Sequence, residues 1–169
     1  MMTTKIAIAG ARGRMGQNLI RSGLSNPHTD IVGVFDISEI NKVFLDEMNL
    51  SHDVATNKES SFDAADIIID FTSPKALFAF TESAVASKTS LVVGTTGLEE
   101  QHFDLLKQTG KSTKIFYAPN MSFGVNSFFG IARKAASYLK DFDIEITETH
   151  HRFKKDAPSG TAIKLGEEI

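Results

Sequence analysis

The stretch KIAIAGARGRMGQNLI, residues 5–20, decides the fold of this chain. Its first five residues are rich in β-branched and apolar side chains and predict a short strand, whereas apolar positions from Arg14 to Leu24 recur at helical spacing. Gly10, Gly13 and Gly16 therefore lie in a turn that leads from a strand into a helix. Glycine lets such a turn approach a pyrophosphate closely, and the helix N-terminus offers oriented N–H donors. Because the middle glycine is displaced from the G-x-G-x-x-G spacing, the turn predicts either a dinucleotide site or a turn that only packs helix on strand.

Strands and helices alternate along the remaining chain. The run DIIIDF is continuous and apolar, as in strands that are buried on both faces of a parallel sheet. Such alternation predicts βαβ crossovers, so the expected fold class is α/β with a Rossmann-like doubly wound parallel sheet. The further expected strands are Asp30–Phe35, Asp66–Phe71, Ser90–Val93 and Lys114–Tyr117, and the further expected helices are Glu39–Met48, Lys75–Ser87, Glu99–Gln108, Val125–Leu139 and Thr161–Ile169.

A second architecture is expected from about residue 125. Asp143–Thr149 alternates apolar and polar residues, which is typical of a half-exposed strand. We therefore expect a dinucleotide-binding Rossmann domain over residues 1–124 and the beginning of an α+β domain over residues 125–169. The alternating strand has no obvious later partner and the helix from Thr161 has no C-cap, so we expect a truncated second domain.

Composition excludes several classes of protein. A net charge of −3 gives no reason to expect nucleic acid or an anionic membrane as partner. No apolar run approaches the roughly 18 residues of a spanning helix, and the N-terminal residues lack the layout of a signal peptide. The absence of cysteine excludes disulfides and thiolate metal sites. We expect a cytoplasmic protein.

Asp36 strengthens the prediction of a dinucleotide site. It ends the second expected strand about twenty residues after Gly16, where an acidic side chain accepts hydrogen bonds from the adenosine ribose. A helix N-cap is the alternative role. A carboxylate repels the 2′-phosphate of NADPH and so favours NADH, but Arg12 and Arg14 can soften that preference. Use of either cofactor stays open.

Small and hydroxyl-bearing residues follow three further expected strands. The segments are FTSP (71–74), GTTG (94–97) and APNM (118–121). Ligands of open α/β sheets bind outside the carboxyl ends of the strands. Each segment alone is an ordinary turn, but together with the glycine turn they predict a nicotinamide site.

The segment HHRFKKDAPSGTA, residues 150–162, combines two imidazoles with three fixed positive charges. A metal site is disfavoured because neighbouring histidines on a strand point to opposite faces and no spaced third ligand follows. A nucleic-acid patch is disfavoured on an acidic chain without an aromatic platform. A solvated basic turn remains an alternative, with Asp156 and Pro158 as turn formers. An anionic substrate accounts for more, since His150 or His151 can hold a proton, Lys154 can donate one, and Ser159–Thr161 opens a helix that can grip a carboxylate.

These motifs together resemble one family. ETHHRFKKDAPSGTA, with GARGRMG, FTSP, GTTG and APNMSFGVN in that order, is similar to the dihydrodipicolinate reductases of lysine and diaminopimelate biosynthesis, from Lys5 to Thr161. The resemblance implies an NAD(P)H-dependent oxidoreductase that reduces 4-hydroxy-tetrahydrodipicolinate, a cyclic dicarboxylate. It also implies a homotetramer built by the second domain, and a further third of chain in family members. We therefore expect the 169-residue chain alone to be a poor enzyme.

Residue roles follow from the same resemblance. His150 takes the position of the acid/base residue and Lys154 that of the proton donor. His151, Gly160 and Thr161 take the substrate-contact positions. Arg12, where many members have a small residue, and Ile37, where some have an arginine, leave the cofactor preference open. The residues at cofactor positions are Gly10, Ala11, Arg12, Gly13, Arg14, Met15, Asp36, Gly94, Thr95, Thr96, Ala118, Pro119, Asn120 and Met121.

Two competing functions would use the same dinucleotide-binding domain. Another Rossmann oxidoreductase of an aspartate-family substrate would leave the K-x-D-A-P-S-G-T segment without a reason. A non-catalytic module that senses NADH would not depend on His150 or Lys154.

Overall fold

The computed structural model describes residues 3–154 and 157–169. Lys155 and Asp156, the latter expected in a turn, lie outside the described residues. The chain divides into two compact units, Met1–Tyr117 and Ala118–Ile169. Each unit is described by itself below.

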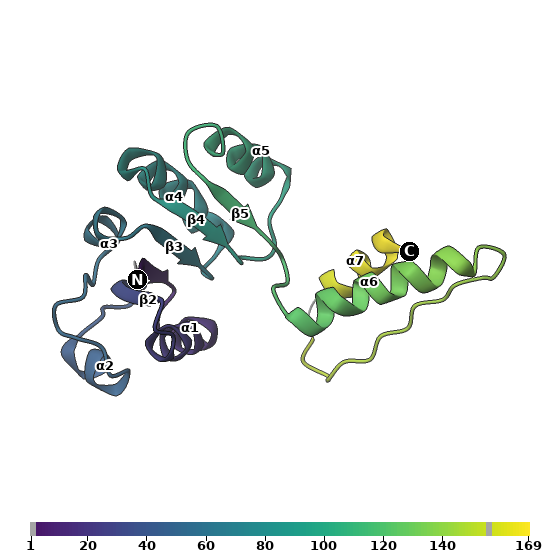
Figure 1. Ribbon diagram of the computed structural model, residues 1–169, viewed down its shortest axis with the longest axis horizontal. Helices are drawn as coiled ribbons and strands as arrows, with labels where there is room; N and C mark the ends of the chain where they lie inside the picture. The colour runs from purple at the N-terminus through teal and green to yellow at the C-terminus, as the bar shows by residue number, and fades with distance from the viewer. Residues whose placement is uncertain (1–2, 155–156) are drawn as a thin grey trace. The chain divides into compact units, whose positions relative to one another are not determined.

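A five-stranded parallel sheet in the order β2-β1-β3-β4-β5 forms the first unit (Figure 1). The order reverses between β1 and β3, which is the switch point where ligands bind in open α/β sheets. The expected α/β class with a parallel sheet is thus confirmed. The strands are β1 (Thr4–Ala9), β2 (Thr29–Phe35), β3 (Ile67–Asp70), β4 (Ser90–Val93) and β5 (Ile115–Tyr117).

Helices cover both faces of this sheet (Figure 1), as the doubly wound arrangement requires. One face carries α1 and α2, and the other carries α3, α4 and α5. Side chains of β1 alternate between the faces, so that Ile6 and Ile8 enter the first core while Ala7 and Ala9 enter the second. The helices are α1 (Arg14–Ser25), α2 (Lys42–Glu47), α3 (Lys58–Ala64), α4 (Pro74–Ser87) and α5 (Glu100–Thr109).

The helix α3 was not expected, because its sequence KESSFDA is mostly polar. Asn57 caps it by accepting a hydrogen bond from the backbone N–H of Ser60 (2.9 Å). Phe62 is its one large apolar residue and is 2% exposed. The ring of Phe62 packs between those of Phe35 and Phe80, at centroid distances of 6.1 and 6.2 Å. One buried aromatic side chain therefore holds this short helix on the sheet.

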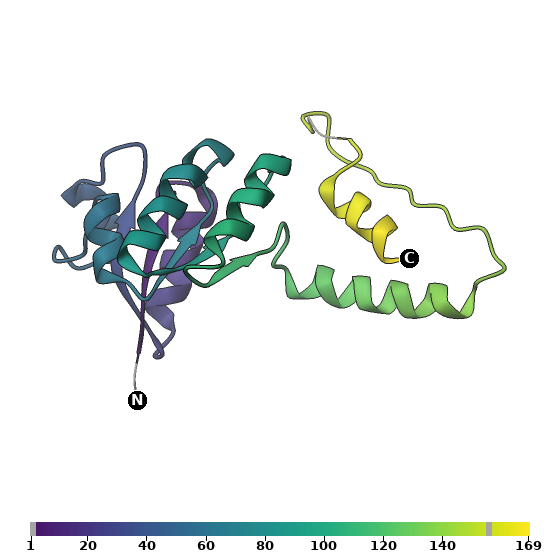
Figure 2. The ribbon, with the colours of Figure 1, turned by 90° about the horizontal axis from the view of Figure 1, so that it is seen from above.

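The second unit contains α6 (Phe123–Tyr138) and α7 (Gly160–Glu168), with an extended connection between them (Figure 2). Arg133 of α6 forms an ion pair with Glu168 of α7. The expected strand at Asp143–Thr149 is wrong: this segment has no strand pairing. An isolated strand leaves its N–H and C=O groups unpaired, and the described part of this unit offers no second strand.

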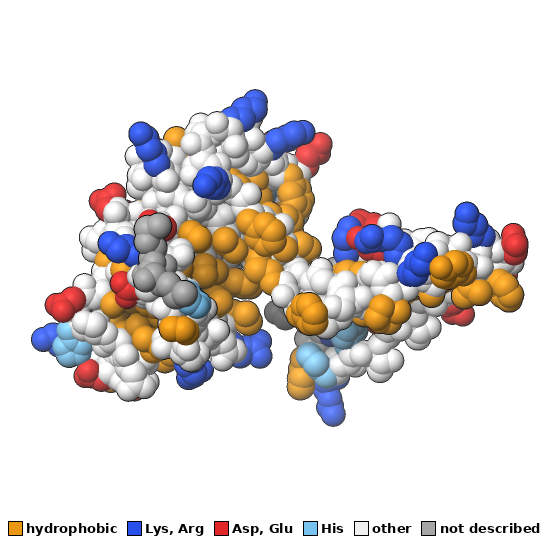
Figure 3. All heavy atoms as spheres, in the orientation of Figure 1, with side chains coloured by type: hydrophobic (Ala, Val, Ile, Leu, Met, Phe, Trp, Pro, Cys, Tyr) orange, Lys and Arg blue, Asp and Glu red, His pale blue; other side chains and the backbone are white. Residues whose placement is uncertain are grey.

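Hydrophobic side chains are exposed on the second unit, as Figure 3 shows along α6. Phe123 is 89% exposed and Ile131 67%.

Each unit also carries one tyrosine. Tyr117 packs edge-on against Phe103 at 5.4 Å, and Tyr138 lies at the end of α6 with the Lys134 ammonium 4.6 Å from its ring. Within the described residues, no helix has the length and apolar character needed to cross a bilayer.

Candidate functional site

The glycine turn after β1 is built by close backbone contacts. Gly10 has a φ of 77°, in the left-handed region. A Cβ on Gly16 would lie 2.1 Å from the carbonyl oxygen of Gly10, so α1 starts directly against the turn. Gly13 precedes the helix, and among the described residues no side chain caps the first N–H groups of α1. These donors are therefore available to an anionic ligand such as a pyrophosphate.

Asp36 joins the turn to the end of β2. Its carboxylate accepts hydrogen bonds from the backbone N–H of Arg12 (2.9 Å) and of Ser38 (3.2 Å). The backbone N–H of Gly10 also donates to the carbonyl of Phe35 (2.9 Å). Asp36 does not cap the next helix, because Asn41 does so by accepting from Phe44 N–H (3.1 Å). The N-cap alternative for Asp36 is therefore excluded, and its carboxylate faces the turn.

The guanidinium of Arg12 is held by groups other than this carboxylate. Its Nε donates to the carbonyl of Glu39 (3.0 Å), and its Cζ lies 4.9 Å from the centre of the Phe44 ring. Among the described residues it forms no ion pair with a carboxylate. Arg12 thus keeps a fixed positive charge near Asp36.

A hollow of about 680 Å³ lies at the carboxyl ends of β1, β2 and β3. It brings together four of the expected cofactor residues, Gly10, Arg12, Gly13 and Asp36, while Arg14 and Met15 lie beside them at the start of α1. Sequence reasoning missed Lys58, whose helix was not expected. The full lining is Gly10, Arg12, Gly13, Phe35, Asp36, Ile37, Lys58, Phe71, Thr72, Ser73, Ala76 and Phe80.

The segments after β3 and β4 are interlocked next to this hollow. A Cβ on Gly94 would lie 2.3 Å from the ring of Phe71, so this glycine makes room for the ring. Thr95 is 3% exposed, whereas Thr96 is exposed. Gly94, Thr95 and Thr96 are not among the residues that line the hollow, but Gly94 and Thr95 contact the loop after β3, which does line it. Ala118, Pro119, Asn120 and Met121 follow β5 and belong to the second unit, where Asn120 accepts a hydrogen bond from Ser122 N–H (2.9 Å) before α6.

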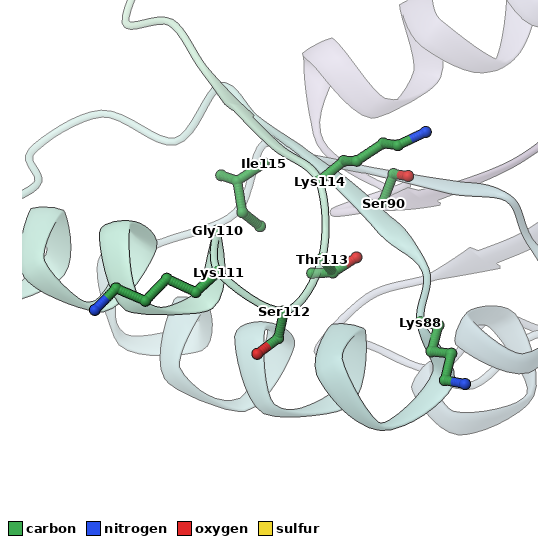
Figure 4. Close-up of a pocket in the computed structure, with 8 residues that line it drawn as sticks. All are labelled: Lys88, Ser90, Gly110, Lys111, Ser112, Thr113, Lys114 and Ile115. Carbon is green, nitrogen blue, oxygen red and sulfur yellow. The ribbon is translucent and has the colours of Figure 1, made fainter.

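A different hollow of about 630 Å³ lies at the amino ends of β4 and β5. Figure 4 shows its three lysines, Lys88, Lys111 and Lys114, extending in different directions rather than converging. It also lies at the edge of the sheet opposite to the carboxyl ends. We therefore do not assign the function to it.

In the second unit, Glu148 organises the candidate substrate segment. One carboxylate oxygen accepts a hydrogen bond from the backbone N–H of Ser159 (2.7 Å). The other accepts from the Ser159 hydroxyl (2.5 Å) and contacts Nε2 of His150 (2.8 Å). Ser159 caps α7 by accepting from the backbone N–H of Ala162 (3.1 Å). A single carboxylate thus links the expected acid/base imidazole to the start of the helix expected to hold the substrate.

The remaining expected substrate residues surround this network. Gly160 and Thr161 are exposed in the first turn of α7, and a Cβ on Gly160 would meet no atom within 4 Å. The Nδ1 of His151 accepts a hydrogen bond from Phe153 N–H (3.1 Å), and the backbone N–H of Lys154 donates to the His151 carbonyl (3.1 Å). A hollow of about 470 Å³ beside Glu148 is lined by Ile146, Glu148, Ala157, Pro158, Ala162, Ile163 and Gly166.

Glu148 was not expected to take part, although it lies two residues before His150. Its pKa is lowered from 4.5 to about 2, first by the hydrogen bond with His150 and then by those from Ser159. Because the pKa is lower in the folded chain, the network stabilises the fold fully above pH 4.5. This contribution is lost as the pH falls through about 2.

The side-chain carboxyl of Glu148 is accordingly expected to titrate near pH 2 in an NMR experiment that follows its ¹³C shift. In Ser159→Ala the hydroxyl donor is missing, so the midpoint is expected to rise toward 4.5. A wild-type midpoint near 4.5 would contradict the network.

In the part of the chain that the structure describes, no group of three or more His, Asp or Glu side chains is placed to hold a metal ion. The donors of both sites, backbone N–H groups with imidazole and ammonium groups, suit anionic ligands instead.

Known proteins match the chain over its full length. The family model for the N-terminus of dihydrodipicolinate reductase matches residues 4–121, and that for its C-terminus matches residues 124–169. A 4-hydroxy-tetrahydrodipicolinate reductase of Colwellia psychrerythraea is 37% identical over 99% of this chain and 65% of its own length. The reductase of Aquifex aeolicus is 36% identical over 98% of this chain and 66% of its own length. The chain thus spans slightly less than two thirds of these relatives.

Solved structures agree with this match. A dipicolinate-bound dihydrodipicolinate reductase from Paenisporosarcina sp. TG-14 has a TM-score of 0.77 and 32% identity, covering 99% of this chain and 66% of that one. GenD2, solved with NAD, is 16% identical with a TM-score of 0.62 over 83% of this chain and 40% of its own, and shows the fold alone. Both parts of the chain match parts of one enzyme in the same order, and the chain belongs to the dihydrodipicolinate reductase family.

Proposed function

We propose that this chain carries the cofactor site and the acid/base segment of a 4-hydroxy-tetrahydrodipicolinate reductase. The observation that supports this most is the bonding of Glu148 to both His150 and Ser159. It holds a protonatable imidazole and the N-terminus of α7 on one carboxylate. The reduction of a cyclic dicarboxylate needs both a proton source and N–H groups that bind a substrate carboxylate.

The first unit binds the cofactor in this proposal. N–H groups at the start of α1 bind the pyrophosphate, and Asp36 accepts hydrogen bonds from the adenosine ribose. The 2′-phosphate of NADPH is repelled by Asp36 but attracted by Arg12 and Arg14, so NADH is favoured weakly and NADPH is also accepted. A reduced nicotinamide supplies the hydride when bound. Gly94 to Thr96, which follow β4, and Ala118 to Met121, which follow β5, would hold the nicotinamide half.

The second unit handles the substrate. N–H groups of Gly160 and Thr161 hold one carboxylate, and His151 also contacts the substrate. The conversion to tetrahydrodipicolinate replaces a hydroxyl by hydrogen, so one hydride and one proton enter while water leaves. His150 and Lys154 are the groups that supply the proton. The first domain of this proposal comprises residues 1–124. Residues 125–169 form part of the second domain, which contributes to tetramerisation.

The reaction belongs to lysine and diaminopimelate biosynthesis in the cytoplasm. The partners in this proposal are the small dicarboxylate and further copies of the same chain in a homotetramer. The acidic net charge of −3 supports the absence of nucleic-acid and membrane partners.

A fluorescence titration with NADH, in the presence and absence of pyridine-2,6-dicarboxylate, tests the function. We expect NADH to bind and the dicarboxylate, a planar mimic of the substrate, to tighten binding. The same titration with NADPH measures the cofactor preference. If the dicarboxylate changes nothing, the substrate half of the proposal is wrong. If neither NADH nor NADPH binds, the proposed cofactor-binding function of the first unit is wrong.

A further inference from the structure

Asp70, at the carboxyl end of β3, is the most buried carboxylate of the first unit, with 0% exposure. Its backbone carbonyl continues the sheet by accepting from Gly94 N–H (2.8 Å). Its side chain points to the same face as Ile68, toward the core under α4. Among the described residues no cation pairs with it. A buried acid without an ion pair needs an explanation, since burial of a charge is costly.

The carboxylate bonds to two different loops. Its Oδ1 accepts from the backbone N–H of Thr72 (2.9 Å) and from the Thr72 hydroxyl (2.6 Å). Its Oδ2 accepts from the Thr95 hydroxyl (3.0 Å), and that hydroxyl also accepts from Thr72 N–H (3.0 Å). An ordinary turn that begins with Asp would need only the bonds to Thr72. The bond to Thr95 ties the loop after β4 to the loop after β3.

The same cluster reaches the phosphate turn. A Cβ on Gly10 would lie 3.1 Å from the Cγ2 of Thr72, so the threonine packs directly against the glycine. The ring of Phe71 fills the space that Gly94 leaves open. Three strand-end loops, after β1, β3 and β4, therefore meet around one carboxylate. In a sheet of this order, they lie under the path from pyrophosphate to nicotinamide.

We infer that Asp70 is a positioning residue for the nicotinamide half of the bound cofactor, which it sets through Thr72 and Thr95. This inference rests on the proposed cofactor-binding function. Asp70 is buried beneath the loops and does not itself line the hollow. Its effect is to fix the loop after β4 relative to the phosphate turn, so that a ligand spanning both meets a preformed site.

Stability alone does not account for this arrangement. The pKa of Asp70 is raised above its usual value, because desolvation by burial outweighs the hydrogen bonds from Thr72 and Thr95. A neutral side chain of the same shape would avoid that cost. Asp70→Asn is therefore expected to unfold at the same urea concentration as the wild type or at a higher one near neutral pH.

The test compares NADH with ADP-ribose, which lacks the nicotinamide. Asparagine keeps only one of the two oxygens that accept from the threonine hydroxyls, and its amide nitrogen is a donor, so one of these two bonds must reverse its direction or break. We expect Asp70→Asn and Thr95→Val to weaken NADH binding roughly tenfold and ADP-ribose binding less than about twofold. The double variant is expected to be no worse than Asp70→Asn, because both changes break the same bond. Thr81→Val is the matched control, since Thr81 is 2% exposed and, within the described part of the chain, its hydroxyl bonds only to the carbonyl of Phe78 in α4 (2.9 Å).

Three outcomes overturn the inference. Unchanged NADH binding in both variants would show that the cofactor site does not depend on the bond between Asp70 and Thr95. Equal losses of NADH and ADP-ribose, or losses matched by Thr81→Val, would show a general structural role. If the wild type bound neither ligand, the proposed cofactor-binding function itself would be wrong, and the role of Asp70 would fall with it.

Discussion

Replacing Gly16 by alanine is expected to cost about 2–3 kcal/mol of the free energy of unfolding and to weaken NADH binding at least roughly tenfold. The new Cβ would lie 2.1 Å from the Gly10 carbonyl oxygen and 2.7 Å from the Ala11 Cα. Both atoms are backbone, so no side chain can move aside to relieve the contact. The start of α1 must shift away from the turn, and its N–H donors shift with it. Urea denaturation and NADH titration of the variant measure the two effects.

Gly130→Ala is the matched control, because Gly130 also lies within a helix but has no atom within 4 Å of an added Cβ. There the alanine is expected to stabilise α6 by up to about 1 kcal/mol through its higher helix propensity. Wild-type stability and NADH affinity in Gly16→Ala would contradict the close packing of helix and turn.

His150→Gln and Lys154→Ala are expected to lower turnover of 4-hydroxy-tetrahydrodipicolinate by roughly 10²- to 10⁴-fold, the usual contribution of a positioned acid or base. The affinity for NADH is expected to stay within about twofold, since these residues belong to the substrate segment. Steady-state rates over a range of pH, with NADH titrations alongside, separate the two effects.

His52→Gln and Lys111→Ala are the controls for these changes. His52 pairs with Asp46 at 2.8 Å in the first unit, and Lys111 lines the hollow at the amino ends of the strands. Neither is expected to change turnover. If His150→Gln and Lys154→Ala left turnover intact, the segment would have no part in the chemistry.

The sheet was predictable because its signals are local. The glycine turn, the apolar run DIIIDF and the regular spacing of strands and helices predicted four of the further strands to within a residue or two. Asp36 was predicted from its distance to Gly16, and the structure adds that its carboxylate bonds to the turn through Arg12 N–H. The match to family models then confirmed the resemblance.

Long-range contacts account for what the sequence did not predict. Asp70 is part of an apolar run, and only the approach of Thr95, 25 residues later, makes it a junction between loops. The helix α3 depends on one phenylalanine, Phe62, that packs against Phe35 and Phe80 on the same face of the sheet. The strand expected at Asp143–Thr149 was wrong because alternation predicts a pleated segment but not a partner. Glu148 was missed because its partner Ser159 lies 11 residues away.

The placement of the two tyrosines makes the units separately visible in emission spectra. The chain has no tryptophan and two tyrosines, of which Tyr117 ends β5 and Tyr138 ends α6. Substituting Tyr138 by phenylalanine leaves tyrosine fluorescence from the first unit alone, and substituting Tyr117 by phenylalanine leaves tyrosine fluorescence from the second. The melting of each half can thus be recorded in the intact chain without attaching a dye.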